Sequence, residues 1–144
     1  MIYTGKTKKA IKLMFDKQKN EIDKGGMPYV FHPFHLAEQM ETEDEVVVAL
    51  LHDIVEDTDV NIEKLAKMGF TKKEIDAISI MTHNKNDSYE EYIKKISTNK
   101  IATKVKIADL KHNLDITRLN EIKTKDLEKI EKYKKSLNYL ENIK

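Results

Sequence analysis

The chain contains no cysteine, which excludes disulfide bonds, thiolate nucleophiles and zinc sites built on cysteine. Its 144 residues include only two prolines and four glycines, so helices are favoured over a fold with many tight turns. No apolar run reaches the roughly 18 residues that a membrane-spanning helix needs. The N-terminal segment also lacks the apolar core of a signal peptide. We therefore expect a cytoplasmic protein without a membrane partner.

Neither sign of charge dominates the composition. The sequence has 26 basic and 25 acidic residues, a net charge of +1 at pH 7, so nucleic acid is not an expected partner. The distribution is uneven, because residues 25–63 contain ten acidic residues and no Lys or Arg. This segment is either an acidic surface balanced by basic faces elsewhere, or a pocket that binds a cation. Charge counting alone favours the surface.

Apolar periodicity and capping signals predict an all-α helical bundle of about eight helices, in a single domain that covers residues 1–144. Pro33 is expected as the first residue of the second helix. Thr42 and Glu45 form a capping-box signature at the start of the third helix. The expected helices span residues 10–18, 33–40, 42–57, 61–68, 71–81, 88–96, 99–115 and 125–142.

The third of these helices carries an unusual polar cluster. Residues 46–57 read VVVALLHDIVED, which is apolar on almost every side until His52 and Asp53. A helix that is hydrophobic all round is normally buried, and buried carboxylates are costly unless they are paired or bind a metal. Helical spacing places His52 above Glu56 on one face, and Asp53 above Asp57. For Glu56 and Asp57 alone, the start of a solvated loop is the better interpretation, but it does not account for His52 and Asp53.

Two further segments supply residues of the same chemistry. Asp109 and Asn113 lie one helical turn apart in KIADLKHNLD. His32 precedes Pro33, so its backbone is expected to be extended at a helix entrance and to direct the imidazole into a cleft. The metal-binding candidates are His32, His52, Asp53 and Asp109. Two imidazoles and two carboxylates suit a divalent ion such as Mn²⁺, Fe²⁺ or Zn²⁺.

Three blocks of the sequence, GGMPYVFHP, LLHDIVEDT and VKIADLKHN, resemble the HD-domain metal-dependent phosphohydrolases. More narrowly, they are similar to the hydrolase half of the RelA/SpoT alarmone enzymes, whose patterns are G-x-PY-x-x-HP, LLHD-x-x-EDT and K-x-AD-x-x-HN. The resemblance covers about residues 25–119 and adds a helix at each end. It implies a stand-alone HD-domain helical bundle that acts on a small-molecule nucleotide.

The resemblance also implies a role for each matching residue. It predicts removal of pyrophosphate from the 3′ position of guanosine 3′,5′-bis(diphosphate), with one Mn²⁺ as cofactor and Fe²⁺, Zn²⁺ or Co²⁺ as alternatives. The implied metal ligands are His32, His52, Asp53 and Asp109. The residues implied to activate water are Glu56 and Asp57. The implied substrate contacts are Lys24, Lys106 and Asn113.

The chain departs from the family pattern around the nucleotide base. Nine residues before His32 the family usually has an Arg, whereas this chain has Asp23 followed by Lys24. Asp115 stands where an Arg often follows the HN pair, and Arg118 is the single Arg of the chain. A different nucleotide or phosphate ester therefore remains an alternative substrate, and a non-catalytic nucleotide-binding HD fold is a further alternative.

The remaining histidines are expected outside the metal site. His35 is predicted to lie near the site or at the surface. His83 could join a second metal ion, but a polar helix end is the simpler prediction. His112 is expected about 60° around the helix from Asp109 and is left out of the predicted site.

Overall fold

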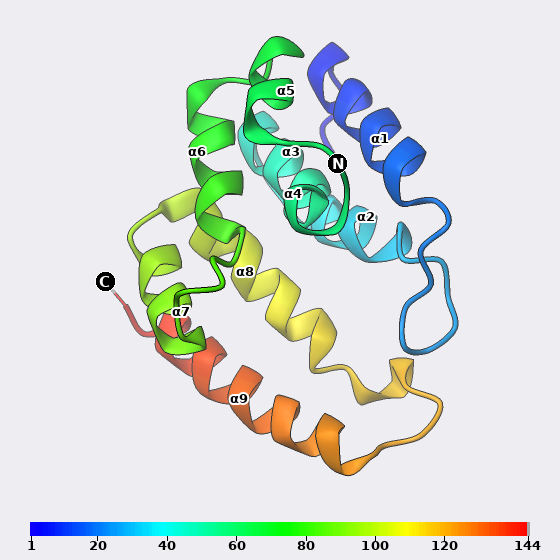
Figure 1. Cartoon of the computed structure of the whole chain (residues 1–144), viewed down its shortest axis with the longest axis vertical. Coiled ribbons are helices and arrows are strands. Elements are labelled where there is room, and N and C mark those ends of the chain that lie inside the picture. Colours follow the sequence, from blue (N-terminus) through cyan, green and yellow to red (C-terminus); the bar gives the residue numbers. More distant parts are fainter. Residues whose placement is uncertain (144) are drawn as a thin grey trace.

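A computed structural model describes residues 1–143, which form nine α-helices and one short 3₁₀ helix (Figure 1). Within these residues the only pairing between extended segments is an isolated antiparallel bridge from Ile22 to Pro28. The all-α prediction is therefore confirmed. The elements are α1 (Gly5–Gln18), α2 (Phe31–Glu38), α3 (Glu43–Leu51), α4 (Ile54–Asp57), α5 (Ile62–Lys67), α6 (Lys72–Met81), α7 (Tyr89–Ser97), α8 (Lys100–Asn113), η1 (Ile116–Arg118) and α9 (Thr124–Glu141).

Helix α3 is the centre of the hydrophobic core. It contacts α1, α2, α6 and α8, and Figure 1 shows it enclosed by other helices. Residues 46–51 expose at most 1% of their surface. A helix surrounded in this way has no solvent-facing side, which explains why its sequence is apolar all round.

The prediction of one continuous helix through residues 42–57 is wrong. Helix α3 ends at Leu51, Asp53 takes φ −107° and ψ 1°, and the short helix α4 begins at Ile54. The His52 ring contributes to this ending, because its Nδ1 lies 2.8 Å from the Ala49 carbonyl oxygen. That contact satisfies a carbonyl that would otherwise lack a partner at a helix end. The break raises the number of helices from the expected eight to nine.

The second helix begins two residues earlier than expected, at Phe31 rather than Pro33. Proline is tolerated in the first turn of a helix, where the backbone N–H groups have no intrahelical partner. His32 is consequently helical and not extended, and its N–H donates to the Tyr29 carbonyl at 2.9 Å. The first turn of α2, rather than an extended entrance, therefore orients the His32 imidazole.

Local capping chemistry is where sequence and structure agree most closely. Thr42 and Thr71 each form both bonds of a capping box, with Glu45 and Glu74 respectively. Gly69 has a φ of +92°, a left-handed conformation that favours glycine and ends the helix before it.

The last helix, α9, buries only part of its apolar side chains. Leu140 is buried, but Leu127 exposes 55% of its surface. Helix α9 lies along α8 and also contacts α7 (Figure 1). Its C-terminal half packs on these helices, while its N-terminal half borders a pocket that includes Asp126, Lys129 and Tyr133.

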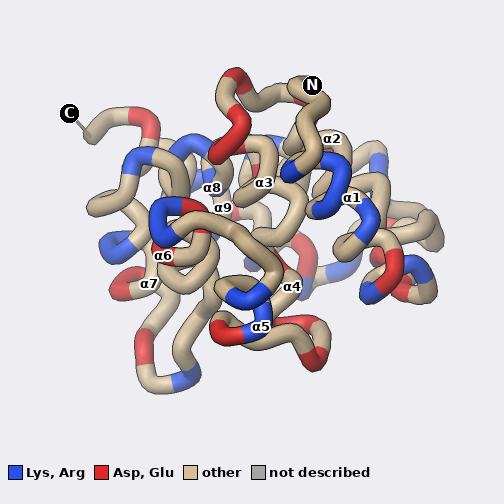
Figure 2. Tube along the Cα trace, turned by 90° about the horizontal axis from the view of Figure 1, so that it is seen from above, with Lys and Arg blue, Asp and Glu red and all other residues tan. Residues whose placement is uncertain are grey.

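Several charges of the acidic segment are matched by lysines. Lys104 bonds to Glu41 at 2.8 Å and to Glu45 at 3.0 Å, and Lys17 pairs with Asp59 at 2.9 Å. Figure 2 shows basic and acidic segments interspersed over the molecule. No helix within residues 1–143 is long and apolar enough to cross a membrane. The surface interpretation therefore holds for much of this segment, whereas Asp53 and Glu56 line the pocket.

Candidate metal centre and its pocket

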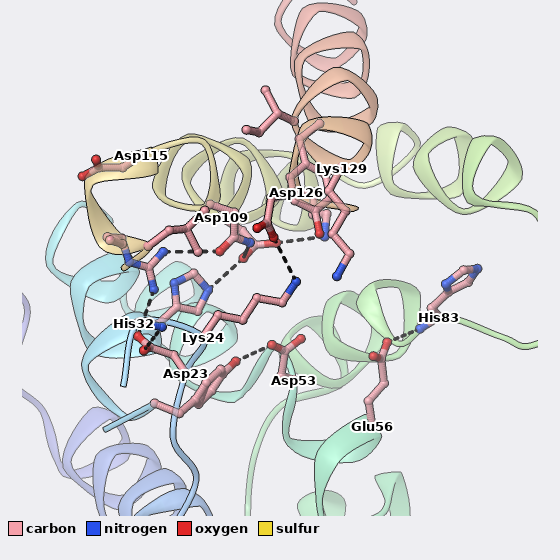
Figure 3. A pocket seen from close by; sticks show the side chains of 18 of the residues that line it. Asp23, Lys24, His32, Asp53, Glu56, His83, Asp109, Asp115, Asp126 and Lys129 are labelled. Carbon is pink, nitrogen blue, oxygen red and sulfur yellow. Dashed lines mark hydrogen bonds and ion pairs between the residues drawn. The ribbon is translucent and has the colours of Figure 1, made fainter. Parts of the chain in front are cut away.

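Two histidines and one aspartate from three separate segments converge beneath the pocket. His32 comes from the first turn of α2, His52 from the end of α3 and Asp109 from α8. One potential ligand atom from each lies within 4.8 Å of the other two. The His32 Nε2 is 2.8 Å from Asp109 Oδ1, and the His52 Nε2 is 3.7 Å from the same oxygen. All three side chains are buried. The structure thus brings together three of the four metal-binding candidates, and Figure 3 shows two of them, His32 and Asp109.

The buried His52 Nε2 is what makes this group fit a metal ion. It forms no hydrogen bond with any partner among the described residues. Since the ring's Nδ1 faces the Ala49 carbonyl, a proton on Nδ1 leaves the lone pair of Nε2 directed at the cluster. Buried polar atoms without partners are rare and costly. A divalent ion bound by two imidazoles and a carboxylate would satisfy this atom.

The charges around His52 favour a cation at the cluster. Burial favours a neutral imidazole, but Asp53 and Asp109 raise the pKa of His52 well above its ordinary value. The two carboxylates therefore favour a positive charge at this position.

Asp53 lies beside the three-residue group rather than within it. Its Oδ2 is 3.2 Å from the His52 Nε2 and accepts a hydrogen bond from the Tyr29 hydroxyl (Figure 3). Burial opposes its charge, but the neighbouring His52 lowers the pKa of Asp53 to about 2. Asp53 is therefore an ionised carboxylate at the edge of the cluster, where Tyr29 holds one of its oxygens.

Asp109 is fixed from several directions. Lys106 donates to its Oδ2 at 2.8 Å, and the Asn113 amide donates to its Oδ1 at 3.1 Å. Burial alone would raise the pKa of Asp109, but Lys106 and His32 bring it well below its usual range. Lys106 is itself buried, and the negative charge of Asp109 keeps the pKa of that lysine well above its usual range. The predicted substrate contacts Lys106 and Asn113 thus line the pocket but are engaged with Asp109.

Sequence reasoning missed one residue of the site, His112. Its Nδ1 lies 2.7 Å from the Nδ1 of His32, so His112 contacts the site from which the prediction had left it out. Burial and the nearby Arg118 lower the pKa of His112 to about 4. A signal was available in the sequence, because His112 follows Asp109 by three residues and positions i and i+3 share a helix face.

The two residues predicted to activate water differ in their placement. Glu56 lines the pocket, and its Oε1 accepts a hydrogen bond from the backbone N–H of His83 (Figure 3). Asp57 is exposed and is not among the residues that line the pocket. Partial desolvation and the neighbouring Asp53 raise the pKa of Asp57 to about 6. The His83 imidazole contacts the Asp87 carbonyl at 3.0 Å, as expected of a polar helix end.

The pocket above the cluster has a volume of about 460 Å³. One wall, from the loop 22–28 and α9, carries Lys24, Asp126 and Lys129 (Figure 3). Lys24 lies 3.7 Å from the Asp126 carboxylate. The nearby ammonium of Lys24 lowers the pKa of Lys129. Two ammonium groups so close together around one carboxylate create a site that attracts an anion.

The loop 22–28 also contacts the single arginine of the chain, which lines the pocket. Arg118 lies 3.5 Å from Asp23 and donates to the His112 carbonyl at 2.9 Å. Gly25 packs against the same segment so closely that an added Cβ would lie 2.0 Å from the Arg118 carbonyl oxygen. The residue that replaces the family's usual Arg, Asp23, is therefore the ion-pair partner of an arginine from elsewhere in the chain.

Comparisons with known proteins agree with this fold. A solved structure described as "A metazoan ortholog of SpoT hydrolyzes ppGpp and plays a role in starvation responses" matches with a TM-score of 0.81 at 21% identity, covering 99% of this chain and 89% of its own. The two proteins share one fold. No family model matches the chain.

A curated relative also matches in sequence. The "Probable guanosine-3′,5′-bis(diphosphate) 3′-pyrophosphohydrolase" of Synechocystis sp. is 28% identical over 114 residues, which cover 69% of this chain. The match spans only 15% of that longer relative. The resemblance to RelA/SpoT-type hydrolases that the three sequence blocks indicated is thus confirmed in both sequence and fold.

Proposed function

We propose that this protein is a Mn²⁺-dependent hydrolase that removes pyrophosphate from the 3′ position of guanosine 3′,5′-bis(diphosphate). The observation that carries the proposal is the buried His52 Nε2 without a partner, facing Asp109 and His32 beneath a pocket with basic groups on its wall. The names of the two similar proteins support the choice of substrate.

Three residues of the cluster would hold the ion: His32 through Nε2, His52 through Nε2 and Asp109 through Oδ1. Asp53, 3.2 Å from the His52 Nε2, is the proposed fourth ligand. When bound, the metal supplies a water of lowered pKa and polarises a phosphoryl oxygen. Lys106 occupies Oδ2 of Asp109 and so leaves the other oxygen for the metal.

Glu56 is the proposed general base. The His83 N–H holds its Oε1, which leaves Oε2 to accept a proton from the attacking water. The water oxygen forms a bond to the phosphorus that carries the 3′ oxygen, and the bond between that phosphorus and the 3′ oxygen breaks. One proton passes from the water to the 3′ oxygen, which gives guanosine diphosphate and pyrophosphate.

We propose a different role for Asp57. Because it lies outside the pocket lining, we propose that it acts through the charge it places behind Glu56 and Asp53. Lys24 and Lys129 would bind the phosphates of the nucleotide, and Asn113 would contact its sugar or base from the edge of the pocket.

The test is a nucleotide panel assayed with Mn²⁺, measuring released pyrophosphate and phosphate separately. We expect pyrophosphate from guanosine 3′,5′-bis(diphosphate) and little phosphate from other nucleotides. Phosphate released from deoxynucleotides would instead support the second candidate, an HD phosphohydrolase with another substrate. The Asp23–Arg118 pair favours that candidate, because it changes the pocket rim relative to the family pattern.

Glu56→Gln separates catalysis from metal binding. Glutamine retains an oxygen for the His83 N–H but cannot take a proton. We expect Mn²⁺ affinity to stay unchanged and turnover to fall by about 10²–10⁴-fold. Asp53→Ala is the contrasting variant, and it should weaken Mn²⁺ binding itself. Equal loss of metal in both variants would contradict this division of roles.

A further inference from the structure

His112 meets His32 edge to edge. The two rings are nearly parallel, at 4°, with centroids 5.0 Å apart, and the two Nδ1 atoms are 2.7 Å apart. The centroid separation exceeds the Nδ1 separation by about two ring radii, so both nitrogens lie on the line that joins the ring centres. The contact is an in-plane hydrogen bond between the rings.

This contact restricts the tautomers of both rings. At 2.7 Å one Nδ1 must carry the hydrogen and the other must present a lone pair. A neutral imidazole carries a single N–H, so each ring's remaining nitrogen is fixed by this choice. If His32 bears the Nδ1 hydrogen, its Nε2 presents a lone pair toward the Asp109 side, 2.8 Å away.

We propose that His112 is a positioning residue that holds His32 in the Nδ1–H tautomer and fixes its ring orientation, so that Nε2 can bind the metal. The inference rests on the metal site of the proposed function. A metal-bound histidine usually donates its other N–H to an acceptor that sets its orientation, and loss of such an acceptor weakens metal affinity. No other acceptor contacts the His32 Nδ1 among the described residues.

Two contacts hold His112 itself in place. Arg118 donates to the His112 carbonyl at 2.9 Å, which fixes the backbone at the end of α8. The His35 ring lies against the other side of His112, with centroids 4.2 Å apart. The His35 side chain is exposed and forms no hydrogen bond with His32, so His35→Leu is a matched control that removes ring packing but leaves the bond between His112 and His32.

The experiment compares Mn²⁺ affinity by titration calorimetry in wild type, His112→Leu, His112→Asn and His35→Leu. Asparagine places an acceptor oxygen near the former Nδ1, whereas leucine does not. We expect His112→Leu to bind Mn²⁺ about 10–100-fold more weakly, and the other two variants to stay within about threefold of wild type. Circular dichroism reports whether each variant is folded.

Each outcome bears on one claim. Equal affinity in His112→Leu and wild type, or equal loss in His112→Leu and His112→Asn, would overturn the role of His112. Absence of Mn²⁺ binding in wild type would overturn the metal site of the proposed function instead. If His112→Leu does not fold, the ¹⁵N spectrum of the wild-type imidazoles loaded with Zn²⁺ decides. A hydrogen on the His32 Nδ1 supports the inference, and a hydrogen on the His112 Nδ1 contradicts it.

Discussion

Lys106→Met should destabilise the metal-free protein much more than the Mn²⁺-bound protein. Methionine retains the length of the lysine stem but removes the ammonium that bonds to Asp109 Oδ2 at 2.8 Å. The two side chains expose only 11% and 6% of their surface, so Asp109 would be left as a buried charge with fewer partners. A bound dication restores the missing positive charge.

The magnitude follows from the burial of the pair. Removing one partner of a buried ion pair costs about 3–5 kcal/mol. Asp109 retains His32 and Asn113 as hydrogen-bond partners. We therefore expect the free energy of unfolding to fall by about 3 kcal/mol, the lower end of this range. In a domain of this size, that corresponds to a fall in Tm of roughly 6–12 °C. Because coupling is reciprocal, Lys106→Met should also bind Mn²⁺ at least about tenfold more tightly, a gain of about 1.4 kcal/mol.

The assay is calorimetric unfolding with a chelator and with saturating Mn²⁺, joined to a direct Mn²⁺ titration. Lys104→Met is the matched control, since Lys104 lies on the same helix but pairs with the surface residues Glu41 and Glu45. That substitution should lower the free energy of unfolding by no more than about 1 kcal/mol under both conditions. Weaker Mn²⁺ binding by Lys106→Met, or an equal loss of Tm with and without Mn²⁺, would refute the reasoning.

Two further predictions concern pH and the pocket rim. Asp53 and Asp109 raise the pKa of His52 above its ordinary value despite burial, and Mn²⁺ requires the neutral ring. Affinity should therefore rise with pH, by about tenfold per unit, until His52 is neutral without metal; a flat profile from about pH 6 to 8 would argue against His52 as a ligand. Gly25→Ala must displace the loop, because its Cβ would lie 2.0 Å from the Arg118 carbonyl oxygen. Nucleotide KM should rise while Mn²⁺ affinity stays constant, and an unchanged KM would show that this rim does not contact the nucleotide.

Local signals in the sequence were sufficient to predict most helices. The capping boxes at Thr42 and Thr71, and the left-handed Gly69, depend only on residues a few positions away. The break at Asp53 could not be read in the same way. It depends on a histidine side chain that bonds to the Ala49 carbonyl, within a stretch whose apolar pattern continues unbroken.

The candidate site was likewise predictable only in part from the sequence. Residue type and order identified His32, His52 and Asp109 as a group, and the structure brings them together. Contacts between distant segments could not be predicted from the sequence, because helix spacing alone does not determine how α2 packs against α8. The bond from His112 to His32 and the Asp23–Arg118 pair both depend on that packing. Lys106 was expected at the substrate, and only the structure shows its contact with Asp109.

The most direct test of the metal centre is anomalous diffraction at the manganese absorption edge from a crystal grown with Mn²⁺. We predict one strong peak within about 2.0–2.3 Å of the Nε2 atoms of His32 and His52 and of Asp109 Oδ1. A protein that crystallises with Mn²⁺ in excess and shows no peak among these three atoms would contradict the account.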